Sequence, residues 1–262
     1  MFNAENKTKL VRNDSVFVYD DGFFLSESMN SSISSKVVVP ILIELLNPTS
    51  VVDMGCGAGA FLEEFRNFNI TDLLGLDNSD IDPKYLLFDR NKILKQNLTE
   101  QFSLKKKFEL AICLEVAEHI DEGESEVFID NLSNLSDVIL FSAAIPGQGG
   151  THHVNEQWPE YWAEKFKNRN FVPFDIIRPL LWNISNIDPI YAQNSILYIK
   201  KEKIELYPNL CGLKAFGHEK LLPLIHPEIY TKKVIKNHKV SNPHVTDLIS
   251  FAAKVWQKIV GS

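Results

Sequence analysis

Residues 51–59 read Val-Val-Asp-Met-Gly-Cys-Gly-Ala-Gly, and this stretch is the strongest indication of the fold. Two β-branched residues followed by an acid are typical of the end of a buried strand, and Ala60-Phe61-Leu62 then opens a helix. Glycines at alternate positions let the chain turn tightly between strand and helix and let a flat ligand approach the backbone. The spacing is G-x-G-x-G, which differs from the G-x-G-x-x-G of dinucleotide-binding turns. The stretch therefore predicts a strand–turn–helix unit that binds a ligand.

Strands and helices alternate along the rest of the chain. Apolar runs predict strands at 50–53, 73–76, 93–96, 108–114, 138–143, 171–177 and 195–199. Helical periodicity predicts helices at 31–46, 60–67, 122–135 and 159–169. This alternation predicts an α/β fold with a mostly parallel, doubly wound sheet, which binds ligands at the carboxyl ends of its strands.

The glycine turn resembles motif I of class I S-adenosylmethionine (SAM)-dependent methyltransferases, and the order of motifs resembles that family over residues 30–200. The resemblance implies a Rossmann-like seven-stranded methyltransferase sheet with helices on both faces. It also implies that the turn wraps the methionine part of the cofactor. The cofactor contacts expected from it are Asp53, Gly55, Cys56, Gly57 and, at the end of the fourth strand, Leu114.

Two further segments support SAM as the cofactor. Asp77 follows the glycine turn by about 20 residues, where an acid can accept both ribose hydroxyls of an adenosine. Residues 96–100 resemble the methyltransferase segment that holds adenine, so Asn97 is expected to bond the amino group and Leu98 to pack on the ring. Most relatives carry Asp in place of Asn97, and Asn78 is expected to flank the adenine. A helix cap for Asp77 and a turn role for Asn97 are the alternatives.

The fourth predicted strand ends in Glu115-Val116-Ala117-Glu118-His119. On a helical turn, Glu115, Glu118 and His119 share one face, where two carboxylates and an imidazole suit Mg, Mn or Zn. The motif E-x-x-E-H resembles a metal site in two O-methyltransferase groups. One methylates catechol-like intermediates of ubiquinone synthesis, and the other methylates the 2′-oxygen of small RNAs and adds a histidine after the fifth strand. A metal-free pairing of Glu118 with His119 is the alternative.

A Gly-rich connection after the fifth predicted strand leads to His152 and His153. We expect His153 to be a further metal ligand and His152 to be a base, with Glu115 also catalytic. Gln157, Trp158 and Arg178 are expected to contact the acceptor, because aromatic rings pack on sugars and Arg can clamp phosphate or carboxylate. Residues 146–194 resemble bacterial methyltransferases of surface-carbohydrate pathways. Burial of the tryptophans in the core is the alternative.

The net charge of −7 is unevenly spread. Residues 1–199 hold 16 Lys and Arg against 29 Asp and Glu, whereas residues 200–262 hold 11 Lys against 5 acids. An acidic main domain argues against a nucleic-acid partner, so a small molecule is the expected one, anionic or sugar-linked. The basic tail is expected to dock on the main domain, and contact with an anionic substrate is the alternative. For its segment 246–260, a homodimer interface is the alternative to covering the main domain.

Three scattered cysteines predict reduced thiols. The apolar run 37–46 is too short to span a membrane, and the cytoplasm is the expected location. The expected domains are a lid segment at 1–30, a methyltransferase domain at 31–200 and a basic, mainly helical extension at 201–262, in which 246–260 is amphipathic.

The expected activity is SAM-dependent O-methyl transfer to a hydroxyl of a small sugar-derived or phosphorylated acceptor, in surface-polysaccharide (capsule-type) biosynthesis. Methylation of RNA at the ribose 2′-oxygen and a non-catalytic SAM-binding module are the alternatives. N-methylation also stays open, because amines need less activation than hydroxyls.

Overall fold

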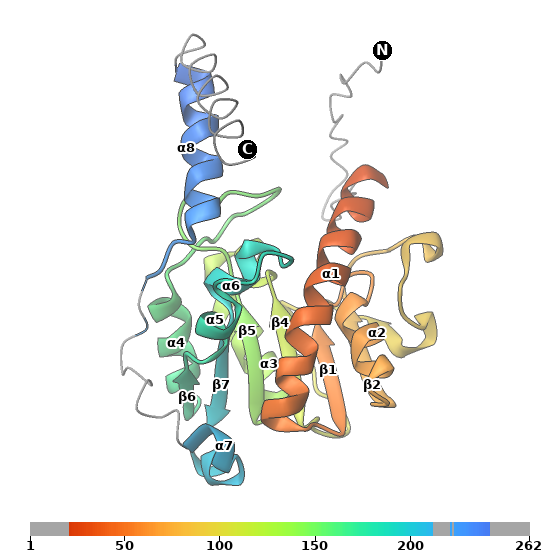
Figure 1. The fold of residues 1–262 in the computed structure, drawn as a ribbon. Coiled ribbons are helices and arrows are strands. Elements are labelled where there is room, and N and C mark those ends of the chain that lie inside the picture. Colours follow the sequence, from red (N-terminus) through yellow and green to blue (C-terminus); the bar gives the residue numbers. More distant parts are fainter. Residues whose placement is uncertain (1–20, 212–220, 222, 242–262) are drawn as a thin grey trace, which may run out of the picture. The chain divides into compact units, whose positions relative to one another are not determined.

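The computed structural model describes residues 21–211, 221 and 223–241, and the chain divides into two compact units between Pro223 and Leu224. The larger unit contains a seven-stranded sheet in the order β3-β2-β1-β4-β5-β7-β6 (Figure 1). The strands are β1 (Ser50–Met54), β2 (Asp72–Asp77), β3 (Ile93–Lys95), β4 (Leu110–Leu114), β5 (Val138–Ser142), β6 (Phe171–Phe174) and β7 (Ile196–Lys200).

The first five strands run parallel, and β7 pairs antiparallel with both β5 and β6. In the centre of the sheet, Asp53 of β1 lies opposite Gly75 of β2 and Ile112 of β4. Because β1 and β4 are parallel neighbours, their carboxyl ends meet at the same edge. The glycine turn after β1 and the acidic segment after β4 are therefore side by side.

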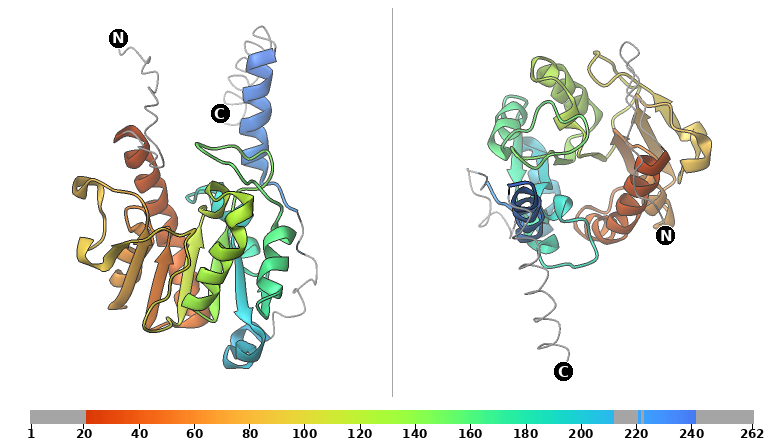
Figure 2. Two further views of the ribbon diagram at one scale, coloured as in Figure 1. Left: turned by 180° about the vertical axis from the view of Figure 1, so that it is seen from behind. Right: turned by 90° about the horizontal axis from the view of Figure 1, so that it is seen from above.

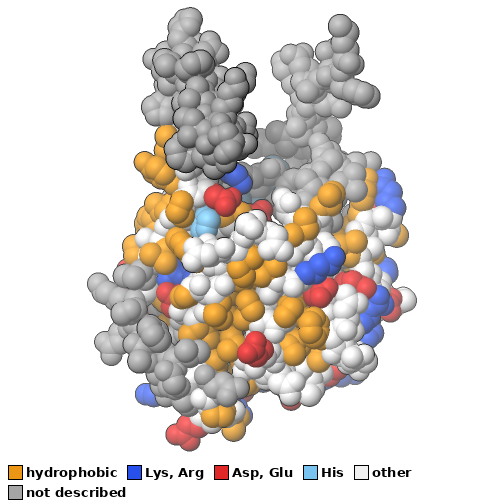
Figure 3. All heavy atoms as spheres, in the orientation of Figure 1, with side chains coloured by type: hydrophobic (Ala, Val, Ile, Leu, Met, Phe, Trp, Pro, Cys, Tyr) orange, Lys and Arg blue, Asp and Glu red, His pale blue; other side chains and the backbone are white. Residues whose placement is uncertain are grey.

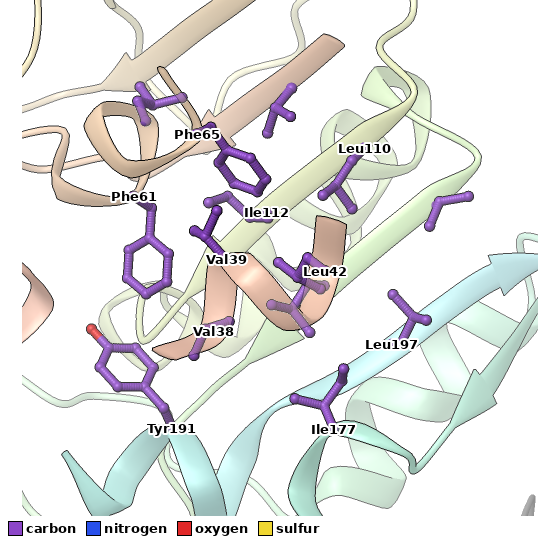
Figure 4. Close-up of a cluster of buried hydrophobic side chains, with 14 of the residues drawn as sticks. Val38, Val39, Leu42, Phe61, Phe65, Leu110, Ile112, Ile177, Tyr191 and Leu197 are labelled. Atoms are coloured by element: carbon purple, nitrogen blue, oxygen red, sulfur yellow. The ribbon is translucent and has the colours of Figure 1, made fainter. Parts of the chain in front are cut away.

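Side chains on the central strands alternate between two cores, because both faces of a doubly wound sheet are covered by helices. Val51 packs on one face and Val52 on the other. On the first face lie α1 (Asp21–Leu46), α2 (Ala60–Asn67), α5 (Ile177–Leu181) and α6 (Pro189–Asn194). Figure 4 shows this core, in which Val39 and Leu42 of α1 meet Leu110 and Ile112 of β4.

The opposite face is covered by α3 (Ser125–Leu135) and α4 (Pro159–Lys167), which are seen from behind in Figure 2. Phe128 of α3 and Trp162 and Phe166 of α4 are fully buried there against Phe141 of β5. The predicted fold class is confirmed: the sheet has seven strands and helices on both faces.

Two element boundaries differ from the prediction. Helix α1 begins at Asp21 rather than at residue 31, so residues 21–30 of the expected lid segment are helical; residues 1–20 lie outside the described part of the chain. Serines inside α1 do not end the helix, because their hydroxyls bond locally or to other elements: Ser35 donates to the Ser32 carbonyl, and Ser34 accepts from the Asp188 amide.

The strand predicted at 171–177 ends at Phe174, and a short helix, α5, begins at Ile177. Asp175 accepts bonds from Arg178 three residues later, which favours a turn over continued extension. Helix α6 was not predicted.

Helix α1 contains one window, Met29–Leu46, that is long and apolar enough to cross a membrane by composition alone. Within it, Val38, Val39 and Leu42 are at most 1% exposed, because they pack in the core of the domain. Of the whole window, 28% is buried.

Beyond β7, the first unit continues into α7 (Pro208–Cys211). The second unit holds α8 (Pro227–Ser241), which agrees with the expected helical extension. The amphipathic segment 246–260 lies outside the described residues. The predicted domain boundaries, at residues 30 and 200, stay predictions.

Candidate active site

The glycine turn leaves one side of its backbone open. Gly55 and Gly57 have φ angles of +87° and +51°, in the left-handed region that disfavours side chains. A β-carbon at Gly55 would lie 2.3 Å from Val116 Cγ2, so the turn packs directly on the segment after β4. A β-carbon at Gly57 would meet no heavy atom of the described chain within 4 Å. The space beside Gly57 is where a ligand can approach the backbone.

Asp77, at the end of β2, faces the same turn. Its Oδ2 accepts from the Gly57 amide at 2.8 Å and its Oδ1 accepts from the Ser79 amide at 2.8 Å. Asp53 lies nearby and is 4% exposed; burial and then the charge of Asp77 raise the pKa of Asp53 well above its usual range. Asn78 is exposed beside them. The two acids therefore border the turn as expected, and their contact with ribose stays a prediction.

In the predicted adenine segment, the side chain of Asn97 already has partners within the chain. Its Oδ1 accepts from the Thr99 amide at 3.1 Å, and its Nδ2 donates to Glu100 at 2.9 Å. Leu98 is buried in the core. These bonds favour the alternative role of Asn97 as a turn residue. Contacts of Asn97 and Leu98 with adenine stay predictions.

Glu115 does not share a helical face with Glu118 and His119, which corrects the sequence-based expectation. Its φ of +55° is left-handed, and only Ala117–His119 forms a single 3₁₀ turn. The amide of Glu115 is held by Ser142 of β5, and its carboxylate accepts from Asn194 and Gln148, each at 3.0 Å. Bonds to three different elements therefore turn Glu115 out of the helical register.

Glu118, His119 and His153 form a compact group whose ligand atoms all lie within 4.8 Å of one another. His153 reaches the group because the Glu118 carbonyl accepts from the amides of Val154 and Asn155, at 2.9 and 3.0 Å. The expected approach of a histidine from the loop after the fifth strand is thus present. Glu115 lies outside this group of three.

The Glu118 carboxylate is the unusual member of the group. The residue is 0% exposed, and neither side-chain oxygen accepts a hydrogen bond of normal geometry. His153 Nε2 lies 3.9 Å from Oε1, too far for a hydrogen bond. Burial and then the charge of Glu115 raise the pKa of Glu118 well above its usual range. A buried carboxylate without a donor is costly unless a cation accompanies it.

Each of the two imidazoles has its Nδ1 bonded within the chain. His119 Nδ1 lies 3.3 Å from the His152 carbonyl, and His153 Nδ1 lies 2.9 Å from Glu156 Oε1. A carbonyl or carboxylate only accepts, so each Nδ1 carries the hydrogen, and Nε2 is left as a possible ligand atom. Burial, and then His153, lower the pKa of His119 to about 4, so its ring is neutral at pH 7. Neutral imidazoles of this kind bind metals.

The Gly-rich loop, coloured green above the sheet in Figure 1, is fixed on both sides. Glu156 accepts from the Gly147 and Gly149 amides at 2.7 and 2.6 Å. On the other side, the Gln148 side chain bonds Glu115, Gln193 and Asn194. Sequence analysis missed Glu156, Gln193 and Asn194. Only Glu156 carries a local signal, since it follows His153 by three residues.

The three residues predicted to contact the acceptor differ in how far their side chains are exposed. Trp158 is 39% exposed, and Gln157 is half-buried with its amide on Asn155 at 2.9 Å. Arg178 is 0% exposed, and its guanidinium holds Asp175 through two bonds of 2.7 and 2.5 Å. This burial favours a structural role for Arg178 over a clamp on substrate. His152 is half-buried with φ +61°, and its role as base stays a prediction.

The chain belongs to a methyltransferase domain family, whose sequence model matches residues 36–184. Members of this family are class I SAM-dependent methyltransferases, which confirms the resemblance and identifies the protein as a SAM-dependent methyltransferase. SAM is accordingly its cofactor. No curated protein matches the chain in sequence.

Solved structures with a similar fold include the magnesium protoporphyrin IX methyltransferase of Synechocystis PCC 6803 with bound S-adenosylhomocysteine. It is 15% identical, with a TM-score of 0.48 over 71% of this chain and 90% of that chain. The methyltransferase domain of a bacterial Hen1 is 18% identical, with a TM-score of 0.46 over 65% and 97%. The sugar N-methyltransferase KedS8 of a Streptoalloteichus species is 17% identical, with a TM-score of 0.43 over 56% and 63%. Similarity at this level concerns the fold alone.

Proposed function

We propose that this methyltransferase transfers the methyl group to a sugar hydroxyl, with a divalent metal held by Glu118, His119 and His153. One observation carries the proposal: the Glu118 carboxylate is fully buried, accepts no hydrogen bond of normal geometry and has ligand atoms of two imidazoles within 4.8 Å. A cation would remove the cost of that burial. One carboxylate with two imidazoles suits Mn or Zn better than Mg, which prefers oxygen ligands.

On the cofactor side, the proposed residues bind and orient. The open backbone at Gly57 leaves room for the methionine part of SAM, and the Asp77 carboxylate accepts hydrogen bonds from the ribose hydroxyls. SAM supplies a methyl group on a sulfonium, whose sulfur leaves as the neutral thioether of S-adenosylhomocysteine. Methyl transfer then depends mainly on aligning the acceptor oxygen with the methyl–sulfur bond. The packing of Gly55 on Val116 supports this alignment, because it joins the cofactor turn to the segment that carries Glu118.

On the acceptor side, a metal supplies positive charge that lowers the pKa of a hydroxyl. We propose that His152 takes the proton of that hydroxyl and that Gln157 and Trp158 line the acceptor site. The exposed Trp158 ring supports a sugar, because aromatic rings pack on the apolar faces of sugars. The acceptor we propose is a small sugar-derived molecule, of the kind used in surface-polysaccharide synthesis. Arg178 is no longer part of the proposal, since its guanidinium is bound to Asp175.

RNA ribose is the second candidate acceptor. What favours it is that His153, from the loop after β5, joins Glu118 and His119, as the resemblance to small-RNA methyltransferases implies. The charge opposes it, because residues 1–199 hold 16 Lys and Arg against 29 acids. On the face drawn in Figure 3, the described Lys and Arg side chains are scattered among acidic and apolar ones.

The test is methyl transfer from labelled SAM to two acceptor sets, nucleotide sugars and oligosaccharides in one and short RNAs in the other. Each set is assayed after chelation and after Mn²⁺ is added back. We expect a methyl ether on a sugar, identified by NMR, and loss of turnover on chelation. Methylated product from the RNA set alone would mean that the acceptor is RNA ribose and not a small sugar-derived molecule. Undiminished turnover after chelation would refute the metal.

A further inference from the structure

Glu156 is bonded through both carboxylate oxygens, although it lies in a loop just before α4. Its Oε1 accepts from His153 Nδ1 at 2.9 Å and from the Gly149 amide at 2.6 Å, and its Oε2 accepts from the Gly147 amide at 2.7 Å. These bonds join the Gly-rich loop to one of the three residues that form the candidate metal group. Partial burial raises the pKa of Glu156, but His153 and the two amides outweigh it and leave that pKa below its usual range.

The direction of the bond to His153 follows from the chemistry of Glu156. Its two oxygens already accept the Gly147 and Gly149 amides, so it acts as an acceptor here and the hydrogen of this contact belongs to His153 Nδ1. The other ring nitrogen, Nε2, then faces Glu118 Oε1 at 3.9 Å. Outer carboxylates of this kind fix the tautomer and orientation of histidines that bind metals.

The space around Nε2 shows how closely the loop is fitted to this ring. A β-carbon at Gly150 would lie 2.1 Å from His153 Nε2. Any side chain at this position would overlap the ring, so the glycine backbone packs directly against the imidazole. The loop and the imidazole are thus arranged as one unit, with Glu156 bonded to both.

We propose that Glu156 is a positioning residue that holds His153 in the Nδ1–H tautomer, with Nε2 directed at Glu118, and that ties the ring to the Gly-rich loop. The consequence for metal binding rests on the proposed function, because it assumes that Glu118, His119 and His153 hold a cation. Removing Glu156 frees the imidazole to rotate and leaves the Gly147 and Gly149 amides without their acceptor.

The first test reads the tautomer without any metal. Ring ¹⁵N–¹H correlation spectra of the full chain are recorded for the wild type, Glu156→Ala and Glu156→Gln, and the His153 signals are assigned by their loss in His153→Gln. We expect the Nδ1–H form in the wild type and a shift towards Nε2–H in both variants. A wild-type ring in the Nε2–H form, or a ring unchanged in both variants, would overturn the proposal.

The second test measures Mn²⁺ affinity of the same proteins by calorimetry, with S-adenosylhomocysteine affinity and melting temperature as checks on folding. Glu160→Gln is the matched control, since Glu160 is an exposed acid at the start of α4 and its loss changes the charge equally. We expect about a 10–100-fold weaker Mn²⁺ affinity in Glu156→Ala, a smaller loss in Glu156→Gln and none in the control.

The outcomes separate the two proposals. Mn²⁺ binding to wild type and Glu156→Ala with equal affinity refutes the positioning role and leaves the metal group in place. A wild type that binds no Mn²⁺ refutes the metal group, and with it the role of Glu156 in metal binding. The tautomer spectra still decide whether Glu156 orients the ring.

Discussion

The cofactor turn and the Glu118 group lie at the same edge of the sheet, but they differ in how their acids are satisfied. Both oxygens of Asp77 accept backbone amides, one from the turn itself. Both oxygens of Glu118 lack a hydrogen-bond partner, although the residue is completely buried. The first region thus has its acid satisfied by the chain itself, whereas the second buries a carboxyl group that accepts no hydrogen bond of normal geometry from the described residues.

The two regions are built in different ways. A short local pattern forms the cofactor turn, whose amides are bonded to Leu76 and Asp77 at the end of β2. The Glu118 group is assembled from two loops, and the proposed cation would complete it. Substitutions in the two regions should therefore act on different equilibria.

The largest effect is expected at Glu118. Glu118→Gln should abolish measurable Mn²⁺ binding and lower turnover by at least about 100-fold, because a neutral amide is a poor ligand for the cation. The metal-free variant should melt at least as high as the metal-free wild type, since the amide replaces an acid that is buried without a hydrogen-bond partner of normal geometry. Calorimetry and thermal melting in the presence of a chelator measure both. Unchanged turnover with a lower melting temperature would mean that Glu118 is a structural residue.

At Asp77, Asp77→Ala should weaken S-adenosylhomocysteine binding by about 10–100-fold, because hydrogen bonds to a charged group contribute about 1.5–3 kcal/mol. Its Mn²⁺ affinity should stay near that of the wild type, which would show that the two regions bind their ligands independently. Asp82→Asn, an exposed position, is the control. Calorimetric titration with each ligand gives both affinities, and equal losses for the two ligands would break the contrast.

A smaller effect is expected from Gly150→Ala. Its new methyl group would lie 2.1 Å from His153 Nε2 and push the imidazole aside, so Mn²⁺ affinity should fall about 10-fold. Gly123→Ala is the matched control, because a β-carbon there meets no heavy atom of the described chain within 4 Å. Both variants are compared by Mn²⁺ titration. If they bind alike, His153 does not contribute to a metal site.

The smallest effect is expected in a region away from both sites. Glu126 is ion-paired with Lys165 and Arg169, which lower its pKa below the ordinary 4.5. Because the pKa of Glu126 is lower in the folded protein, its ion pairs stabilise the fold above pH 4.5. This stabilisation is lost as the pH falls through the folded-state pKa of Glu126.

Because the Glu126 side chain is exposed, Glu126→Gln should lower the melting temperature at pH 7 by at most about 3 °C and flatten its decline below about pH 4.5. Thermal melts between about pH 3 and 7 measure this. Mn²⁺ and S-adenosylhomocysteine affinities should not change, and a change in either would mean that the two regions are coupled through the surface.

Most of the fold could be predicted from the sequence because its signals are local. Alternating apolar runs and the glycine turn place β1 and α2 within a residue of their observed bounds. Helix α6 and the early start of α1 escaped prediction, because tertiary contacts rather than periodicity stabilise them. Ser31 of α1, for example, lies 3.3 Å from the Tyr191 hydroxyl of α6.

The candidate site was predicted only in part. Glu118, His119 and His153 could be named from the motif and the order of elements, since parallel strands bring their carboxyl ends together. The left-handed conformation of Glu115 could not, because it depends on Asn194, which lies 79 residues away. The burial of Arg178 likewise depends on packing that no local pattern encodes.

The proposed function depends on a cation that is bound by Glu118 and two histidines beside the cofactor turn. Anomalous scattering from crystals grown with S-adenosylhomocysteine and Mn²⁺ locates that cation. We expect a manganese peak bound by Glu118, His119 and His153, with S-adenosylhomocysteine against Gly57. S-adenosylhomocysteine bound at the turn, with no manganese among those three side chains, would contradict it.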